Sequence, residues 1–204
     1  MKDYKIIFLI KSDTVNLNNY TIKDIPGSSG RLDVIARCIL SALLNEKGFD
    51  INYKIWIFFK RYGALKFDPL DLNYEDFPKN ELLLSEYIVK LLKTTDTAAV
   101  IKEYNPLSPI LVENISLIEF LKQRKKENRN NIFVLRESGR KFLDVFSPQS
   151  LKKEVYIIIG SQTEDFINSE AFLNLNFPEV SLGVKSYLAS QVIRLIKLNI
   201  NHFL

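Results

Sequence analysis

The sequence contains one histidine, His202, and one cysteine, Cys38, in 204 residues. A single cysteine excludes an internal disulfide and every cysteine-cluster metal site. A single histidine near the C-terminal end excludes a multi-histidine metal site and disfavours the usual Ser-His-Asp and Cys-His catalytic arrangements. We therefore expect no metal. If the protein is an enzyme, we expect its chemistry to depend on carboxylates, arginines and a cofactor.

The sequence also lacks long apolar runs, repeats, low-complexity linkers and the GxGxxG and Walker phosphate-binding motifs. The apolar run at residues 6–10 is too short for a signal-peptide core or a membrane span. We expect a cytoplasmic protein that does not bind membranes. A chain of 204 residues can bury a sizeable core without disulfides, so we expect one domain over residues 1–204.

Acidic residues are slightly fewer than basic ones, 24 against 28, which gives a formal net charge of +4. This charge, with a sequence pI of about 9.0, permits binding to nucleic acid but does not identify it. The hydrophobic fraction of 47% is that of an ordinary globular protein rather than a disordered or membrane protein.

The most informative stretch is Thr21–Arg37, which reads TIKDIPGSSGRLDVIAR. Its proline and two glycines predict a rigid turn that other groups can approach closely. Arg31 and Asp33 then stand at the opening of a helical apolar pattern that runs to about residue 44. Backbone N–H groups and charged side chains could converge there on an anionic partner such as a phosphate.

The same stretch also fits an ordinary helix start. In that interpretation Ser29 or Gly30 is the N-cap, and Asp33 does no more than complement the helix dipole. Both interpretations stay open on the residues alone, because glycine-rich loops are common.

Hydrophobic patterns predict the remaining elements. Short continuous apolar runs rich in isoleucine and aromatic residues predict strands, and apolar residues at helical spacing predict helices. The expected strands are residues 5–10, 52–59, 65–67, 132–135, 155–160 and 179–183. The expected helices are residues 32–44, 81–92, 115–124, 164–173 and 185–199. Alternation of strands and helices in the last third of the chain predicts an α/β fold with parallel strands.

Three of these strands end at Leu135, Gly160 and Leu182-Gly183. In a parallel sheet the three ends would lie side by side, at the edge where open α/β sheets bind ligands. Residues 136–139 are expected to form a turn after the first of them. The closing helix has apolar residues on more than one side, which favours packing against a second subunit as well as its own domain.

Two other groups of basic residues could contact RNA. Lys60 and Arg61 follow the aromatic strand 52–59, together with Tyr62. The run 122–129 is rich in lysine and arginine at the end of a predicted helix. Each group also fits a plain structural role, as a solvated strand end or as cations that favour the helix dipole.

The segment Ile22–Asp33, continuing to Arg37-Cys38, resembles the N-terminal motif of the archaeal TrmY methyltransferases. That family belongs to the SPOUT superfamily and methylates N1 of pseudouridine 54 in the T-loop of tRNA. The similarity resumes at residues 132–139, at 155–160 and from Val180 through the last helix. The chain departs from the family with Ser161-Gln162 in place of Asp-His and with Gly183-Val184 in place of Ser-Pro.

The resemblance implies a mostly parallel sheet with helices on both faces, a C-terminal trefoil knot and a homodimer formed through the C-terminal helix. It also implies that the knotted part, about residues 130–204, binds S-adenosylmethionine. The family's motif places the cofactor-binding residues at Leu135, Gly160, Leu182, Gly183, Val184, Lys185, Ser186, Tyr187 and Val192.

The implied reaction transfers a methyl group from a sulfonium to a ring nitrogen, so the protein must align donor and acceptor and assist loss of the N–H proton. Asp33 is the candidate for that proton or for orienting the base, and Arg31 for holding a phosphate or stabilising charge on the ring. Arg37, Lys60 and Arg61 would then contact the RNA, as would Arg31. Tyr62 is a candidate for stacking on a displaced base.

Two other functions remain open on the sequence. A related protein could methylate a pseudouridine in small-subunit ribosomal RNA and assist ribosome assembly. A protein with the same fold could also have lost catalysis and act as a dimeric RNA-binding protein.

Overall fold

The computed structural model describes residues 4–94, 104–128, 131–146, 154–160 and 166–203. Within these residues one seven-stranded sheet has the order β6-β5-β4-β1-β8-β7-β9. The strands are β1 (Lys5–Ser12), β4 (Tyr53–Phe59), β5 (Gly63–Phe67), β6 (Leu111–Glu113), β7 (Ile132–Lys141), β8 (Glu154–Ile159) and β9 (Glu179–Ser181). A separate short hairpin pairs β2 (Leu44–Asn45) with β3 (Gly48–Phe49).

The sheet is parallel from β4 through β1, β8 and β7 to β9, and only the pairings of β5 with its neighbours β4 and β6 are antiparallel. The central strand β1 is buried on both faces. Ile6 and Phe8 contribute to the core on one face, and Ile7 and Leu9 to the core on the other. Double burial explains why this strand is a continuous apolar run rather than an alternating one.

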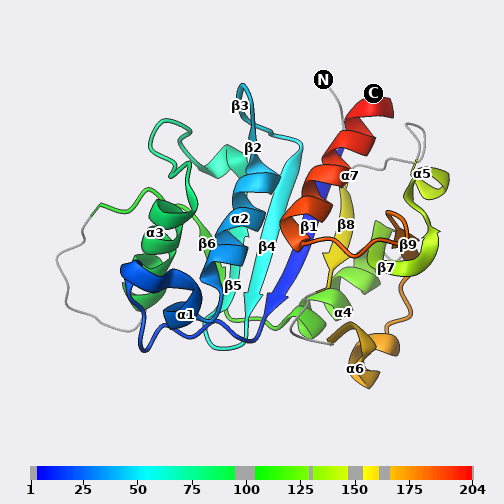
Figure 1. Cartoon of the computed structure of the whole chain (residues 1–204). Helices are drawn as coiled ribbons and strands as arrows, with labels where there is room; N and C mark the ends of the chain where they lie inside the picture. Colours follow the sequence, from blue (N-terminus) through cyan, green and yellow to red (C-terminus); the bar gives the residue numbers. More distant parts are fainter. Residues whose placement is uncertain (1–3, 95–103, 129–130, 147–153, 161–165, 204) are drawn as a thin grey trace.

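Helices cover both faces of the sheet (Figure 1). The main helices are α2 (Leu32–Leu43), α3 (Glu81–Thr94), α4 (Leu117–Asn128) and α7 (Ala189–Phe203), and the short ones are α1 (Ile25–Ser29), α5 (Phe142–Val145) and α6 (Glu170–Leu173). The core on one face contains residues of α2, α3 and α7, and the core on the other contains residues of α4 and α6. The expected α/β fold with a mostly parallel sheet and helices on both faces is therefore confirmed.

The turn expected before α2 contains a helix of its own. Residues Ile25–Ser29 form the short helix α1, in which Pro26 occupies the first turn and the Asp24 carboxylate accepts a hydrogen bond from the Gly27 N–H at 3.0 Å. Proline is well suited to that position because the first turn has no partner for its missing N–H. The glycine-rich turn is thus a capped helical turn.

Strand β7 extends beyond the expected 132–135. It runs to Lys141, and the turn expected at residues 136–139 appears as an irregularity in its pairing with β9, where Leu135 and Arg140 both oppose Val180. Gly139 lies in this bulge, and a Cβ atom on it would lie 2.6 Å from the Val180 backbone nitrogen. Only glycine therefore allows the two backbones to approach so closely.

The last helix begins later than expected, at Ala189 rather than Lys185. Its start is fixed by Gln191, whose side-chain oxygen accepts a hydrogen bond from the Leu188 N–H at 3.0 Å. This contact is half of a capping box, which marks a helix start through a polar side chain rather than through apolar spacing. Residues 182–188 therefore remain free to form a loop.

Other expectations were incomplete. Residues 164 and 165 of the helix expected at 164–173 lie outside the described residues; the rest splits into a 3-10 turn, η4 (Phe166–Asn168), and the four-residue helix α6. Ser169 separates them because its backbone is extended. Strand β6, the β2–β3 hairpin and α5 were not predicted, because each is too short to show a period.

Among the described residues, no helix is both long enough and apolar enough to cross a membrane. The described part of the chain also brings together no three histidine, cysteine, aspartate or glutamate side chains that could hold a metal ion.

Candidate functional site

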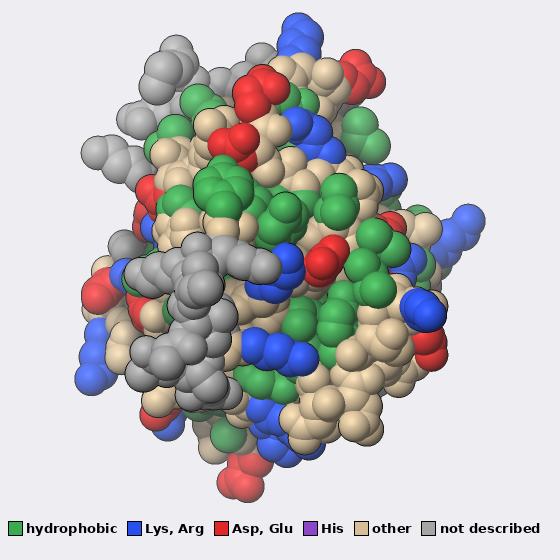
Figure 2. All heavy atoms as spheres, turned by 90° about the vertical axis from the view of Figure 1, so that its left-hand side faces the viewer, with side chains coloured by type: hydrophobic (Ala, Val, Ile, Leu, Met, Phe, Trp, Pro, Cys, Tyr) green, Lys and Arg blue, Asp and Glu red, His purple; other side chains and the backbone are tan. Residues whose placement is uncertain are grey.

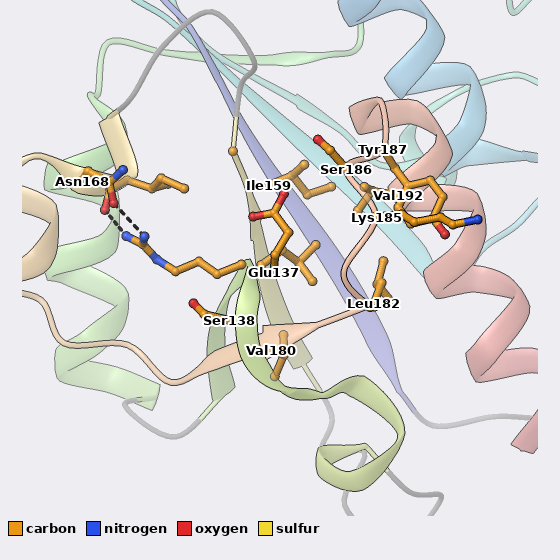
Figure 3. A pocket seen from close by; sticks show the side chains of 15 residues that line it. Glu137, Ser138, Ile159, Asn168, Val180, Leu182, Lys185, Ser186, Tyr187 and Val192 are labelled. Atoms are coloured by element: carbon orange, nitrogen blue, oxygen red, sulfur yellow. Dashed lines mark hydrogen bonds between the residues drawn. The ribbon is translucent and has the colours of Figure 1, made fainter.

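A cavity of about 340 Å³ lies at the carboxyl ends of β7, β8 and β9, beneath the loop that leads to α7 (Figure 3). Its lining consists of Leu135, Arg136, Glu137, Ser138, Ile159, Gly160, Ile167, Asn168, Val180, Leu182, Gly183, Lys185, Ser186, Tyr187 and Val192. The three predicted strand ends therefore meet at one cavity. Its volume falls in the ~300–1,000 Å³ range of small-molecule and cofactor sites.

Eight of the nine residues expected to contact a cofactor line this cavity. The ninth, Val184, does not line it, because its side chain is 91% exposed on the outer side of the loop. The departure Ser161-Gln162 lies outside the described residues. The cavity combines apolar walls from Leu135, Leu182 and Val192 with backbone groups at strand ends, which suits a flat heterocycle.

Ser181 lies behind the cavity, where it fixes two of the lining residues, and it was not singled out in the sequence. Its buried hydroxyl donates to the Glu137 carbonyl at 3.0 Å and accepts from the Gly183 N–H at 3.0 Å. The first bond fixes the β7 bulge, and the second fixes the start of the loop. Gly183 has a φ of 115°, a conformation that L-residues rarely adopt.

Arg136 fixes the opposite wall and was also missed. Its guanidinium donates to the Asn168 side-chain oxygen at 2.7 Å and to the Ile167 carbonyl, and its Nε lies 2.9 Å from a Glu179 oxygen. Dashed lines beside Asn168 in Figure 3 mark hydrogen bonds of this wall. Since its guanidinium is engaged with protein groups, Arg136 acts as part of the wall.

The helix that follows the loop is joined to α2 through Lys197. The Lys197 ammonium donates to the carbonyl oxygens of Ala42 at 2.9 Å and Leu44 at 3.0 Å, and lies 3.4 Å from the Asp50 carboxylate. Burial lowers the pKa of Lys197, an effect that Asp50 opposes. The carbonyls belong to the C-terminal end of α2, where a cation is electrostatically favourable.

At the other end of α2, Asp33 lies between two arginines. Arg31 donates from Nε to Oδ1 at 3.1 Å and from Nη2 to Oδ2 at 3.3 Å, and Arg37 donates from Nη2 to Oδ2 at 2.6 Å. Arg31 has the unusual positive φ of 73° for a non-glycine residue, which carries a conformational cost. We call Arg31, Asp33 and Arg37 the charged corner.

The expectation that Ser29 or Gly30 is the N-cap of α2 is wrong. The N-cap position of α2 is Arg31, which makes no side-chain cap. Ser29 still contributes, because its hydroxyl accepts from the Leu32 N–H at 3.0 Å. That N–H group is therefore not available to an anionic ligand. The positive charge at this helix start is supplied by the side chains of Arg31 and Arg37.

A second cavity of about 160 Å³ lies against the two arginines of the charged corner, although Asp33 itself, whose side chain is 12% exposed, is not among its lining residues. It is lined by Arg31 and Arg37 from the corner, and by Gly160 and Tyr187, which also line the first cavity. Cys38 lies in its wall, and burial raises the pKa of this thiol to about 12. The two predicted parts of the site therefore adjoin within one chain.

The other predicted RNA contacts lie elsewhere. Lys60 and Arg61 are exposed after β4 and line a third cavity of about 420 Å³, which shares Lys11 with the second cavity and no lining residue with the first. Tyr62 is not free to stack on a base without rearrangement, because its hydroxyl accepts from the Leu17 N–H at 2.8 Å and its ring packs edge-on against Phe59.

On the face formed by α1 and α3, Figure 2 shows basic side chains among apolar ones.

Comparison with known proteins shows which family the chain resembles. A family model described as "Putative SAM-dependent RNA methyltransferase" matches residues 5–203. Similar curated proteins include the tRNA (pseudouridine(54)-N(1))-methyltransferase of Thermococcus gammatolerans, 31% identical over 94% of this chain and 94% of that protein. The protein of the same name from Thermococcus onnurineus is 29% identical, with the same shares covered.

Among solved structures, the crystal structure of Archaeoglobus fulgidus Nep1 bound to S-adenosylhomocysteine superposes with a TM-score of 0.61, covering 98% of each chain at 16% identity. This likeness supports the expected SPOUT-like fold. The family match extends over almost the whole sequence, from the first strand to the end of the last helix. The chain therefore belongs to the family of S-adenosylmethionine-dependent RNA methyltransferases.

Proposed function

We propose that this protein transfers the methyl group of S-adenosylmethionine to N1 of pseudouridine 54 in the T-loop of tRNA. The observation that carries the proposal is that the two cavities share Gly160 and Tyr187 in their walls, so that a cofactor-sized space lies near the charged corner. The names of the Thermococcus relatives support the choice of tRNA and of position 54.

We assign the cofactor contacts to residues that line the first cavity. In our proposal the apolar side chains of Leu135, Leu182 and Val192 cover the faces of the adenine, and backbone groups near Gly160 and Gly183 bind its polar edge. Lys185, Ser186 and Tyr187 would contact the remaining polar groups. When bound, the cofactor supplies an electrophilic methyl group on its sulfonium, so the protein need not activate the donor.

The charged corner would act on the acceptor base. Asp33 would accept the N1 proton on a carboxylate oxygen as the new carbon–nitrogen bond forms, since each oxygen retains lone pairs beyond its bonds to arginine. Arg31, whose side chain is 55% exposed, would stabilise negative charge on the ring or hold a phosphate. The second cavity, with Val34 and Ile35 in its wall, would receive the uracil ring.

The RNA backbone would contact Arg31, Lys60 and Arg61, which are exposed. We assign Arg37 a different main role from the expected RNA contact. Its donors are directed to the Asp33 side chain, the Asp33 carbonyl and, at 3.6 Å, the Glu81 carboxylate. Arg37 is thus a positioning residue for Asp33.

We also propose that the protein is a cytoplasmic homodimer with a trefoil knot within about residues 130–204. The dimer would form through α7. Ile193, Ile196 and Ile200 are fully buried in the core, whereas Leu188 and Leu198 are 42% and 66% exposed, and these exposed side chains supply apolar surface for a second subunit.

The proposal is tested with purified protein, S-adenosylmethionine and tRNA transcripts that carry either pseudouridine or uridine at position 54. Nucleoside mass spectrometry should detect 1-methylpseudouridine only in the first transcript. A ribosomal RNA fragment containing pseudouridine serves as the competing substrate, and preferential methylation of that fragment would contradict the choice of tRNA. Absence of cofactor binding in titration calorimetry would instead favour a non-catalytic RNA-binding protein.

A further inference from the structure

Glu137 is a charged residue of the first cavity that neither the family motif nor the sequence patterns singled out. It belongs to the bulge of β7, directly after Arg136, and its side chain extends into the cavity toward Ile159 in Figure 3. Its backbone carbonyl is held by Ser181 at 3.0 Å. The position of the residue is therefore fixed while its side chain projects inward.

The charges around the cavity differ in what they bind. Among the described lining residues, the charged ones are Arg136, Glu137 and Lys185. Arg136 is engaged with Asn168, Ile167 and Glu179. Within the described chain the Glu137 carboxylate makes no hydrogen bond or ion pair, and neither does the Lys185 ammonium, so one negative and one positive group are available to a ligand.

The two groups come from different walls. Glu137 comes from the sheet, and Lys185 comes from the loop before α7. A ligand in the cavity would meet the Glu137 carboxylate on the sheet side, whereas the Lys185 side chain points away from Glu137 in Figure 3 and would have to turn to reach the ligand. S-adenosylmethionine carries both signs at its methionine end, namely a sulfonium and an ammonium as cations and a carboxylate as anion.

We propose that Glu137 is a binding residue for the cationic methionine end of the cofactor. This inference rests on the proposed function, because it takes S-adenosylmethionine as the ligand of the cavity. A carboxylate that pairs with a cation in a partly enclosed site makes a charge-assisted bond stronger than a neutral one. The ribose hydroxyls and the adenine would then depend on other groups of the cavity.

The test is titration calorimetry of wild-type protein and of Glu137→Gln with S-adenosylmethionine, S-adenosylhomocysteine and 5′-methylthioadenosine. The substitution keeps the size of the side chain and removes its charge. We expect about 10- to 100-fold weaker binding of S-adenosylmethionine, and less than twofold change for methylthioadenosine, which has neither cation. Equal weakening of the first two ligands identifies the ammonium, and weakening of the first alone identifies the sulfonium.

The matched control is Glu46→Gln, which removes an exposed carboxylate in the β2–β3 turn and should bind all three ligands as wild type does. Equal weakening of all three ligands by Glu137→Gln would overturn the proposal in favour of a ribose contact, and unchanged affinities would overturn it outright. Failure of wild-type protein to bind S-adenosylmethionine would instead contradict the proposed function.

Discussion

The first cavity and the charged corner are built in opposite ways. The cavity consists mainly of strand ends, backbone groups and apolar side chains, and the polar residues that shape it, Ser181 and Arg136, are bonded to the protein. The corner consists of Asp33 and two arginines that hold one another. The difference teaches that the first region is built to bind a ligand, through its shape and the charge of Glu137, whereas the charges of the second are arranged to react with one. Substitutions should therefore separate binding from turnover.

The largest effect is expected from Asp33→Asn. The amide keeps the shape of the side chain but cannot accept the proton or pair fully with both arginines, so the methylation rate should fall about 100-fold or more. Affinity for S-adenosylmethionine should stay within twofold, because Asp33 does not line the first cavity. Single-turnover methylation and calorimetry measure the two quantities, and full activity of the variant would remove Asp33 from the mechanism.

The next largest effect is expected from Gly139→Ala, in the β7 bulge beside the first cavity. Gly139→Ala would place a Cβ atom 2.6 Å from the Val180 nitrogen, so β7 and β9 must move apart. We expect about tenfold weaker binding of S-adenosylmethionine together with a lower melting temperature, since backbone strain of this kind typically costs about 1–3 kcal/mol. Methylation at saturating cofactor should remain near wild type. Unchanged affinity and melting temperature would show that the bulge does not shape the cavity.

A smaller effect is expected at Arg37 of the charged corner. Arg37→Lys keeps the charge but loses the forked guanidinium that reaches both the Asp33 side chain and its carbonyl. We expect kcat to fall about fivefold to tenfold with little change in KM for tRNA, because charge remains while geometry is lost. A change in KM alone would instead restore Arg37 as an RNA contact.

The smallest effect is expected at Cys38, in the cavity between the two regions. Because burial raises the pKa of its thiol to about 12, almost no thiolate exists at pH 8, and reactivity should rise only as the pH approaches 12 or the protein unfolds. Thiol reagents should therefore label the native protein slowly and the unfolded protein quickly. Cys38→Ala should leave methylation and cofactor binding within about twofold, since neither proposed step uses the thiol; rapid native labelling would contradict this burial.

The sequence predicted the cavity better than the details of its walls. Leu135, Gly160 and Leu182 were found because each lies at the end of a predicted strand, and parallel strands bring such ends together. The β7 bulge could not be predicted, because its cause is the approach of the Val180 backbone, which is distant in sequence. Arg136 was missed for the same reason, since its partners are about 30 to 40 residues away.

The charged corner was predicted from a motif rather than from periodicity. The motif placed Arg31 and Asp33 together, but it did not show that Arg37, one helical turn later, shares the Asp33 carboxylate. The i,i+4 spacing of Asp33 and Arg37 was the signal that could have indicated this contact. The late start of α7 had a similar local signal in Gln191, three residues after Leu188.

The most direct test of the central claim is the affinity for S-adenosylmethionine of two variants in the same loop, measured by calorimetry. Ser186 lines the first cavity, whereas Val184 is 91% exposed and lies outside it. If the cavity holds the cofactor, Ser186→Trp should weaken binding about 30-fold or more by filling the space, and Val184→Trp should bind within about twofold of wild type. Equal affinities of the two variants would show that the cofactor binds elsewhere.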